Sequence, residues 1–255
     1  MLVYVGIALL GWMLGVLINY LADVLPRKRQ LSAPFCSNCE TTQSLFNYIV
    51  WPRRCPKCDY HRPIRTWLVE LVYIGLAVWL WYSPPENLGF LIGLVLLVFF
   101  GLVIIIDLEH RLILHRVSFA GALLGFVIGI RLHGLWVTLL GGIAGFGFML
   151  ILYFLGEWLI RLIAHWRGQT VDDVALGFGD VNLGGVLGLV IGWPGIVLGL
   201  FIAILSAGVV SLIYLLIMVG IRRYKMFMAL PYGPFLITGA VVLLYFQNLL
   251  KTWLK

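Results

Sequence analysis

Long apolar stretches alternate with short polar ones along the chain, and the apolar stretches define the predicted elements. Apolar runs of about 18 or more residues are typical of transmembrane helices. This pattern predicts eight helices, over residues 2–25, 66–82, 88–107, 113–132, 135–164, 181–193, 195–221 and 229–250. Turns at Ser83-Pro84-Pro85 and Trp193-Pro194-Gly195 separate neighbouring helices. The predicted fold class is an all-α polytopic membrane protein.

One polar segment is long enough to form a small domain outside the membrane. It divides the chain into a first transmembrane helix at 1–25, a cytoplasmic loop domain at 26–65 and a membrane core at 66–255. With this loop in the cytoplasm, the cytoplasmic segments together hold 15 of the 18 Lys and Arg residues. Cytoplasmic loops of membrane proteins carry such an excess of basic residues, so the distribution predicts a multi-pass chain with its N-terminus outside.

Composition supports the membrane class. The chain is 62% hydrophobic and 11% charged, with a mean hydropathy of +1.02, which is more apolar surface than a soluble domain of this length can bury. The N-terminal apolar run lacks a basic start and a small-residue cleavage site, so we expect a retained helix rather than a cleaved signal peptide. The net charge is +7. We attribute it to basic loops that set the topology and contact anionic lipid headgroups, not to nucleic-acid binding.

The four cysteines all lie in the polar loop, as two CxxC pairs: Cys36 with Cys39, and Cys55 with Cys58. This spacing is typical of a four-thiolate zinc site, and nearby Arg53, Arg54 and Lys57 favour thiolates. Two disulfides or four free thiols are the alternatives, although disulfides are rare in the cytoplasm. Four protein thiolates leave no open zinc position, so the predicted Zn²⁺ is structural and stabilises a loop too small to fold well alone.

Two aspartates mark candidate chemistry. Asp107 follows the apolar run 102–106, and Asp180 ends the motif Gly177-Phe178-Gly179-Asp180. The topology derived from basic residues places both at one membrane edge. Two adjacent carboxylates can share a proton, activate a water and protonate a leaving amine, which is the chemistry of aspartic proteases. Gly177 and Gly179 lack Cβ atoms, so backbone or substrate can approach Asp180 closely.

An aspartate at a helix end can equally be a cap or an interfacial residue, so the spacing alone leaves the role of this pair open. We interpret the competing acids as solvated in loops (Glu109, Asp172 and Asp173) or as packed polar partners on helices (Glu70 and Glu157). The five histidines show no metal-ligand spacing, and no serine lies in a recognisable His-based arrangement.

Together these features resemble the type IV prepilin peptidase family of GxGD-type membrane aspartic proteases. The resemblance is carried by Gly15 to Asn19, Leu25-Pro26, the two CxxC pairs, Leu68 to Leu71, Ile106-Asp107, Gly177 to Asp180, and Pro231-Tyr232-Gly233-Pro234, which is similar to the family's Pro-Phe-Gly-Pro. The chain departs from the pattern at Val24, where an Arg is often seen, and at Asn182, where a Lys is common. The stretch between the CxxC pairs is shorter than usual, and the linker at 166–175 is enlarged.

The resemblance implies that Asp107 and Asp180 are the catalytic pair, with supporting roles at the active site for Gly177, Gly179, Glu70, Pro231 and Gly233. The implied substrates are prepilins or pseudopilins of type IV pilus or type II secretion systems. Their short basic leader would be cut from an apolar helix at the cytoplasmic face of the bacterial inner membrane. Many members also methylate the new N-terminus with S-adenosylmethionine, an activity associated with the cysteine loop, and this cofactor is expected only if that activity is present.

Two other function classes are alternatives. Intramembrane carboxylates also mark transporters and channels, which would place them near the bilayer midplane and in symmetric halves. A non-catalytic assembly factor that docks a partner through the zinc loop would need the cysteines and not the aspartates. The sequence specifies neither the pilin nor the secretion system served, nor the oligomeric state.

Overall fold

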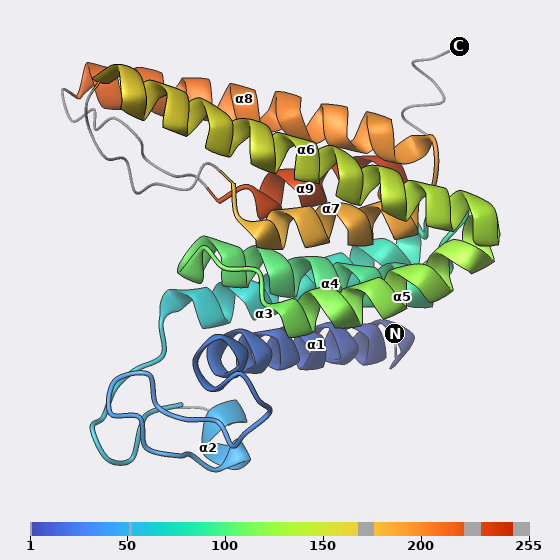
Figure 1. The fold of residues 1–255 in the computed structure, drawn as a ribbon. Helices are drawn as coiled ribbons and strands as arrows, with labels where there is room; N and C mark the ends of the chain where they lie inside the picture. Colours follow the sequence, from blue (N-terminus) through green and yellow to red (C-terminus); the bar gives the residue numbers. More distant parts are fainter. Residues whose placement is uncertain (1, 51–52, 168–175, 222–230, 247–255) are drawn as a thin grey trace. The chain divides into compact units, whose positions relative to one another are not determined.

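The computed structural model describes residues 2–50, 53–167, 176–221 and 231–246, which form helices joined by turns (Figure 1). The helices are α1 (Leu2–Lys28), α2 (Leu45–Ile49), α3 (Ile64–Tyr82), α4 (Gly89–His110), α5 (His115–His133), α6 (Leu135–Arg167), α7 (Phe178–Ile191), α8 (Gly195–Gly220) and α9 (Gly233–Tyr245). The predicted all-α membrane fold is confirmed, and its eight helices correspond to α1 and α3–α9. The additional helix, α2, is a single turn whose N-cap Ser44 accepts a hydrogen bond from the Asn47 N–H.

Helix length separates the apolar helices into two groups. Within the residues that the structure describes, six helices are long and apolar enough to cross a membrane: α1, α3, α4, α5, α6 and α8. In contrast, α7 and α9 have 14 and 13 residues. At ~1.5 Å per residue each extends only about 20 Å, less than the ~30 Å hydrocarbon core of a bilayer. Two of the eight predicted helices are therefore too short to span the membrane by themselves.

Some predicted features lie outside the described residues. They are most of the enlarged linker at 166–175 with Asp172 and Asp173, the basic residues at 222–225, and the predicted end of the last helix beyond Phe246. The two predicted turns are within the described parts. The first lies between α3 and α4, and the second follows Gly192, whose φ of 76° ends α7 in the left-handed conformation that glycine adopts readily.

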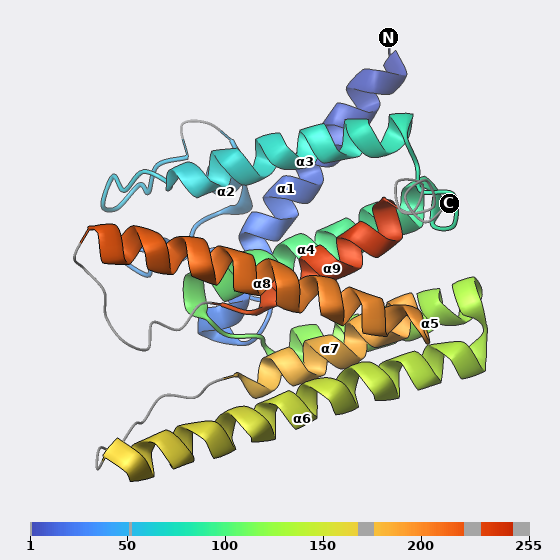
Figure 2. The same cartoon turned by 90° about the horizontal axis from the view of Figure 1, so that it is seen from above.

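The chain divides into two compact units, residues 1–106 and 107–255. In the first unit α1 crosses α3 (Figure 2). The crossing is close because glycines face α3: a Cβ on Gly11 would lie 2.6 Å from the Tyr73 carbonyl oxygen, and one on Gly15 would lie 2.7 Å from the Glu70 Cα. Tyr73 also ties α3 to α4, since its hydroxyl donates to the Leu97 carbonyl at 2.6 Å. The predicted boundaries at 25 and 65 separate elements within this unit.

The second unit is built around α7, which packs against α5, α6 and α9, while α8 packs against α9. Glycines bring the α6 and α7 backbones into contact: a Cβ on Gly145 would lie 2.3 Å from the Gly184 carbonyl oxygen, and one on Gly141 would lie 2.4 Å from that of Gly188. No larger side chain fits between these backbones, and ten of the 14 residues of α7 are buried. The core therefore holds α7, and with it Asp180, in one position.

Candidate active site and cysteine centre

Asp107 belongs to the second unit and lies in the last turns of α4, where the apolar run that buries this helix ends. The helix stops shortly afterwards, because Arg111 takes a φ of 50° and donates its N–H to the Asp107 carbonyl at 2.8 Å. The Asp107 side chain is only 5% exposed. Its Oδ2 accepts a hydrogen bond of 2.9 Å from the Gly233 N–H at the start of α9. A helix start favours a carboxylate, so α9 is oriented to stabilise charge on Asp107.

Asp180 lies in the first turn of α7 and is 8% exposed. Its Oδ2 accepts a hydrogen bond of 3.2 Å from the N–H of Gly177, the N-cap residue. The other oxygen, Oδ1, is buried and has no hydrogen-bond partner among the residues that the structure describes. A buried polar oxygen without a partner is unfavourable unless a water, a proton or a ligand satisfies it. Asp180 thus caps its helix with one oxygen and presents the other to the interior.

The two carboxyls lie close enough for their charges to interact. Each is fixed by a glycine N–H at a helix start, although Asp107 and Gly233 are 126 positions apart in the chain. Proximity, burial and one oxygen free of hydrogen bonds together suit a pair that shares a proton and binds a water. The catalytic role of the pair stays a prediction that this geometry supports.

The predicted glycines bring neighbouring groups close to the carboxyls. A Cβ on Gly233 would lie 2.6 Å from the Asp107 Oδ2, and one on Gly179 would lie 2.7 Å from the Ile113 Cβ. Gly179 therefore faces the turn between α4 and α5 rather than open space for a substrate. The sequence analysis did not single out Ile113, since nothing in its local pattern marks it. Pro231 precedes Tyr232, the N-cap residue of α9, and the Tyr232 hydroxyl is within electrostatic range of Asp180.

Gly233→Ala tests this close approach. The added methyl would push against the Asp107 carboxylate and displace it from the Gly233 N–H, so we expect cleavage of substrate to fall at least about tenfold, as small misplacements of catalytic groups do. Gly208→Ala is the matched control, because a Cβ at Gly208 meets nothing within 4 Å. Equal activity of the two purified variants would show that Asp107 tolerates the displacement.

Glu70, the fifth residue with an implied active-site role, belongs to the first unit and forms a buried ion pair there. Arg53 donates to its two carboxylate oxygens at 2.6 and 3.1 Å, and the Trp12 indole N–H donates to Oε2 at 2.9 Å. Arg53 also lies over the Trp67 ring, 4.7 Å from its centroid. Glu70 therefore packs as a polar partner within the first unit, as one interpretation of the sequence expects. The active-site role of Glu70 stays a prediction.

The other competing acids differ from the pair in exposure. Glu109 is exposed at the end of α4. Glu157 accepts from the Tyr153 hydroxyl at 2.7 Å and pairs with exposed Arg161 at 3.1 Å, four residues further along α6. Asp172 and Asp173 lie outside the described residues. Among the acids of the second unit that the structure describes, the buried ones are Asp107 and Asp180.

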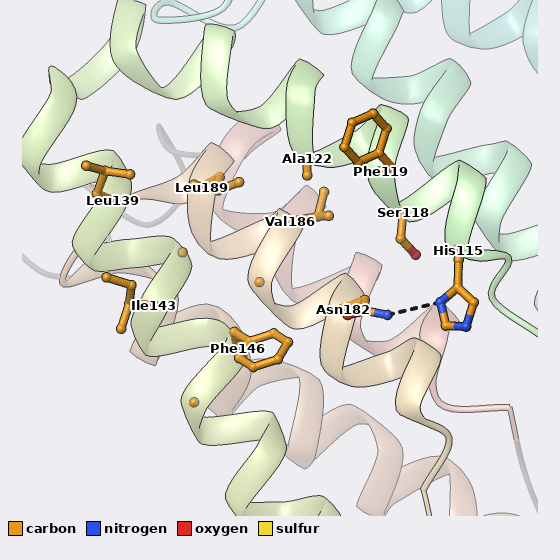
Figure 3. A pocket seen from close by; sticks show the side chains of 13 residues that line it. His115, Ser118, Phe119, Ala122, Leu139, Ile143, Phe146, Asn182, Val186 and Leu189 are labelled. Atoms are coloured by element: carbon orange, nitrogen blue, oxygen red, sulfur yellow. Dashed lines mark hydrogen bonds between the residues drawn. The ribbon is translucent and has the colours of Figure 1, made fainter.

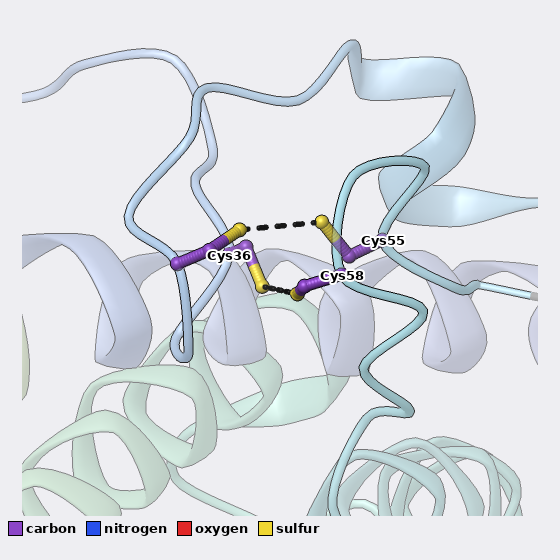
Figure 4. Close-up of side chains that lie close together, drawn as sticks. Cys36, Cys55 and Cys58 are labelled. Atoms are coloured by element: carbon purple, nitrogen blue, oxygen red, sulfur yellow. Dashed lines mark hydrogen bonds between the residues drawn. The ribbon is translucent and has the colours of Figure 1, made fainter.

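The four cysteine sulfurs gather at one point, all within 4.8 Å of one another. Cys36 and Cys58 approach to 3.6 Å, and Cys39 and Cys55 to 3.5 Å, so the two CxxC turns face each other (Figure 4). A disulfide needs sulfurs at about 2.05 Å, whereas ligands on a tetrahedral zinc at ~2.3 Å lie about 3.8 Å apart. The arrangement therefore fits a metal ion better than two disulfides.

The two CxxC turns have the same backbone geometry. In each, the first cysteine accepts a hydrogen bond from the residue after the second cysteine, and that residue has a positive φ: 54° at Glu40 and 51° at Asp59. Isolated β-bridges close the turns, between Phe35 and Thr42 and between Arg54 and His61. Two equivalent turns that converge their sulfurs are a preformed site for a tetrahedral ion.

Backbone N–H groups are the main stabilisation of the Cys55 thiolate. Arg53 pairs with Glu70, and Arg54 lies 3.8 Å from Asp59. The backbone N–H of Lys57, followed by that of Cys58, lowers the pKa of the Cys55 thiol to about 5. Although the Tyr60 N–H favours a Cys58 thiolate, burial and the neighbouring thiols raise the pKa of Cys58 to about 12. Four adjacent thiolates repel one another, so a cation is needed to hold all four in the ionised form.

The loop region offers a weaker match for S-adenosylmethionine. A hollow of about 530 Å³ lies beside the first CxxC turn, and its lining includes Tyr20, Ser32, Gln43 and Ser44 together with apolar residues. Among the described residues that line it, none is an acidic residue of the kind that binds ribose hydroxyls in nucleotide sites. The residues therefore do not identify a site for this cofactor.

Comparison with known proteins covers almost the whole chain. The model of the type IV leader peptidase family matches residues 94–213. The prepilin leader peptidase/N-methyltransferase of Pseudomonas aeruginosa is 25% identical, over 97% of this chain and 92% of that protein. Proteins of the same name from Aeromonas salmonicida (24% identical, 100% and 93% covered) and Dichelobacter nodosus (28%, 81% and 75%) are also similar. No solved structure matches significantly. These similarities extend over most of the chain, and the model of the type IV leader peptidase family matches the part that contains both Asp107 and Asp180.

Proposed function

We propose that this multi-pass membrane protein is a prepilin leader peptidase that cuts its substrates with Asp107 and Asp180. The observation that carries the proposal is the buried pair itself. One oxygen of each carboxyl is fixed by a glycine N–H, and no described residue forms a hydrogen bond with the Oδ1 of Asp180. Such an arrangement can hold a water between two groups that differ in protonation, as aspartic proteases require.

In the proposed mechanism the ionised aspartate takes a proton from the water as its oxygen attacks the scissile carbonyl carbon. The protonated aspartate donates to the carbonyl oxygen, which gives a tetrahedral diol. Collapse of the diol breaks the C–N bond: the protonated aspartate gives its proton to the leaving amine, and the ionised aspartate takes the proton of one diol hydroxyl as the new carboxyl group forms. The pair thereby returns to its shared-proton state. The step needs one water and no covalent enzyme intermediate.

The proposed substrates are prepilins or pseudopilins, in which a short basic leader precedes an apolar helix. The relatives carry prepilin leader peptidase in their names and match most of this chain. We further propose that the active site faces the cytoplasm at the inner membrane, with the N-terminus outside. The distribution of basic residues along the sequence supports this orientation.

Incubation of the purified protein with a model prepilin tests the function. We expect a single cut at the junction between leader and apolar helix, identified from product masses. A prepilin whose junction residues are replaced by bulky side chains controls for nonspecific proteolysis and should remain intact. If the protein leaves the prepilin uncut while a known prepilin peptidase cuts it in the same detergent, the peptidase proposal is wrong and the docking or transport alternatives take its place.

We propose that the metal of the cysteine centre is zinc and that its role is structural, because the four thiolates complete a tetrahedral shell. When bound, zinc would join the two CxxC turns, and no catalytic step passes through it. We expect about one zinc per chain by elemental mass spectrometry, and less than about one fifth of that in Cys55→Ser. Ser37→Ala, within the first turn but not a ligand, should keep full zinc. A Cys55→Ser protein that keeps full zinc would contradict the site.

N-methylation is a second candidate function. It is favoured by the relatives' names, which include N-methyltransferase, and by matches that extend over the cysteine turns. The test supplies cleaved pilin and S-adenosylmethionine and looks for a mass increase of one methyl group on the new N-terminus. An unmodified product after complete cleavage would restrict the protein to the peptidase activity.

A further inference from the structure

A groove of about 600 Å³ lies on the second unit between α5, α6 and α7 (Figure 3). Its volume is within the roughly 300–1,000 Å³ typical of small-molecule sites. The space exists because small residues line it, among them Ala122, Gly142, Gly147 and Gly185. Along α7 it extends from Asn182 to Leu189, about 10 Å at ~1.5 Å per residue.

The groove is separate from the aspartate pair. Asn182 follows Asp180 by two residues on α7, and two residues turn an α-helix by about 200°. The groove therefore lies on the face of α7 opposite to the one that carries Asp180. A peptide bound in the groove would have its scissile bond on the face of α7 that points away from Asp180. The groove is therefore not the position of the substrate during cleavage.

The lining changes in polarity along the groove. Its apolar part contains Leu139, Ile143 and Leu189, whereas His115, Ser118 and Asn182 cluster at the other end (Figure 3). His115 and Ser118 of this polar end lie at the start of α5, and Asn182 lies near the start of α7. Because Asp180 is also in the first turn of α7, the polar end and Asp180 are at the same end of the unit. In a membrane protein, polar groups at a helix end are at headgroup depth, and the apolar body beyond them is at acyl-chain depth.

The polar end carries several groups that can donate hydrogen bonds. The α5 N-cap is Leu114, which has no side chain that can accept from the first N–H groups of the helix. The Ser118 hydroxyl is in the first turns of α5. The residue is 7% exposed, and within the described parts of the chain its hydroxyl has no hydrogen-bond partner. The Asn182 amide nitrogen and the His115 Nδ1 are in contact at 3.5 Å. An uncapped helix start with nearby hydroxyl, amide and imidazole groups suits a phosphate.

From this geometry we infer that the groove binds one phospholipid, with its phosphate against the start of α5 and an acyl chain along α7. The phosphate would accept from the Ser118 hydroxyl, which otherwise is buried at a cost, and from the Asn182 amide. The acyl chain would cover the apolar lining between α5 and α6. The site does not depend on the peptidase proposal, because the aspartates take no part in it.

Photolabelling and native mass spectrometry test the site in the full-length protein. The protein is placed in nanodiscs of phosphatidylethanolamine and phosphatidylglycerol with a trace of phosphatidylethanolamine that carries a diazirine in the middle of an acyl chain. We expect labelling of Ile143 and Val186, and one lipid retained per protein after release into detergent. Ala122→Phe, which fills the groove, should lower both signals at least tenfold. Ala120→Phe, an exposed α5 position outside the groove, is the matched control and should leave them unchanged.

Ser118→Ala separates phosphate binding from a general effect on folding. Removal of a buried, unpartnered hydroxyl should leave thermal stability in lipid-free detergent equal or higher, while lipid retention falls several-fold. Equal labelling of wild type and Ala122→Phe would overturn the inference. It would also be overturned if the groove residues cross-linked to a second copy of the chain, or if an added prepilin peptide displaced the lipid label completely.

Discussion

Asp107→Asn and Asp180→Asn are each expected to lower prepilin cleavage by about 10³-fold or more, because an amide can neither take a proton from water nor donate one to the leaving amine. The substitutions should leave the fold intact. Each amide oxygen can still accept from its glycine N–H, that of Gly233 or Gly177, which are the contacts that hold the carboxyls now. Cleavage rates of purified variants, measured together with thermal unfolding, check both parts.

The control for charge removal is Glu157→Gln, which neutralises an acid paired with an exposed arginine on α6. We expect it to change cleavage less than twofold, since surface ion pairs contribute little. Robust cleavage by either folded aspartate variant would contradict the two-aspartate mechanism. A loss of cleavage that accompanies unfolding would instead assign a structural role to that carboxyl, as the cap interpretation of Asp180 proposes.

Glu70→Ala is expected to lower the free energy of unfolding by about 3–5 kcal/mol, because it leaves the Arg53 guanidinium buried without its carboxylate. Arg53 is 5% exposed and Glu70 4%, so water does not replace the lost partner at either position. The Trp12 indole N–H loses its acceptor as well. Denaturant unfolding in detergent measures the change, and zinc content reports whether Cys55, two residues from Arg53, is still held in place.

The double variant Arg53→Met/Glu70→Leu distinguishes a structural role from an active-site role for Glu70. Apolar residues of similar size often replace a buried ion pair without loss of stability, so we expect the double variant to be within about 1 kcal/mol of wild type. If cleavage recovers with stability, Glu70 acts by holding the loop to α3. If stability recovers and cleavage does not, the active-site role implied by the family resemblance is supported instead.

The membrane fold and the candidate residues could be predicted because their signals are local. Apolar runs reveal helices whatever they pack against, and two CxxC pairs bring four thiols within reach of one ion through turns of only a few residues. The end of an apolar run at Asp107 and the glycines before Asp180 are likewise visible in short windows. The basic residues predict an orientation for the same reason, since the loops that carry them adjoin the helix ends.

The pairings between distant segments required the tertiary structure. No local pattern joins Gly233 to Asp107, Arg53 to Glu70, or Ile113 to Gly179, because each contact depends on how separate helices pack. The short lengths of α7 and α9 also required the tertiary structure, because both helices end at turns between packed neighbours. The sequence by itself determined which side chains are available for metal binding and catalysis. The packing of α7 against α5, α6 and α9 decided which oxygen of Asp180 is left without a partner, because burial and hydrogen bonding are properties of the folded chain.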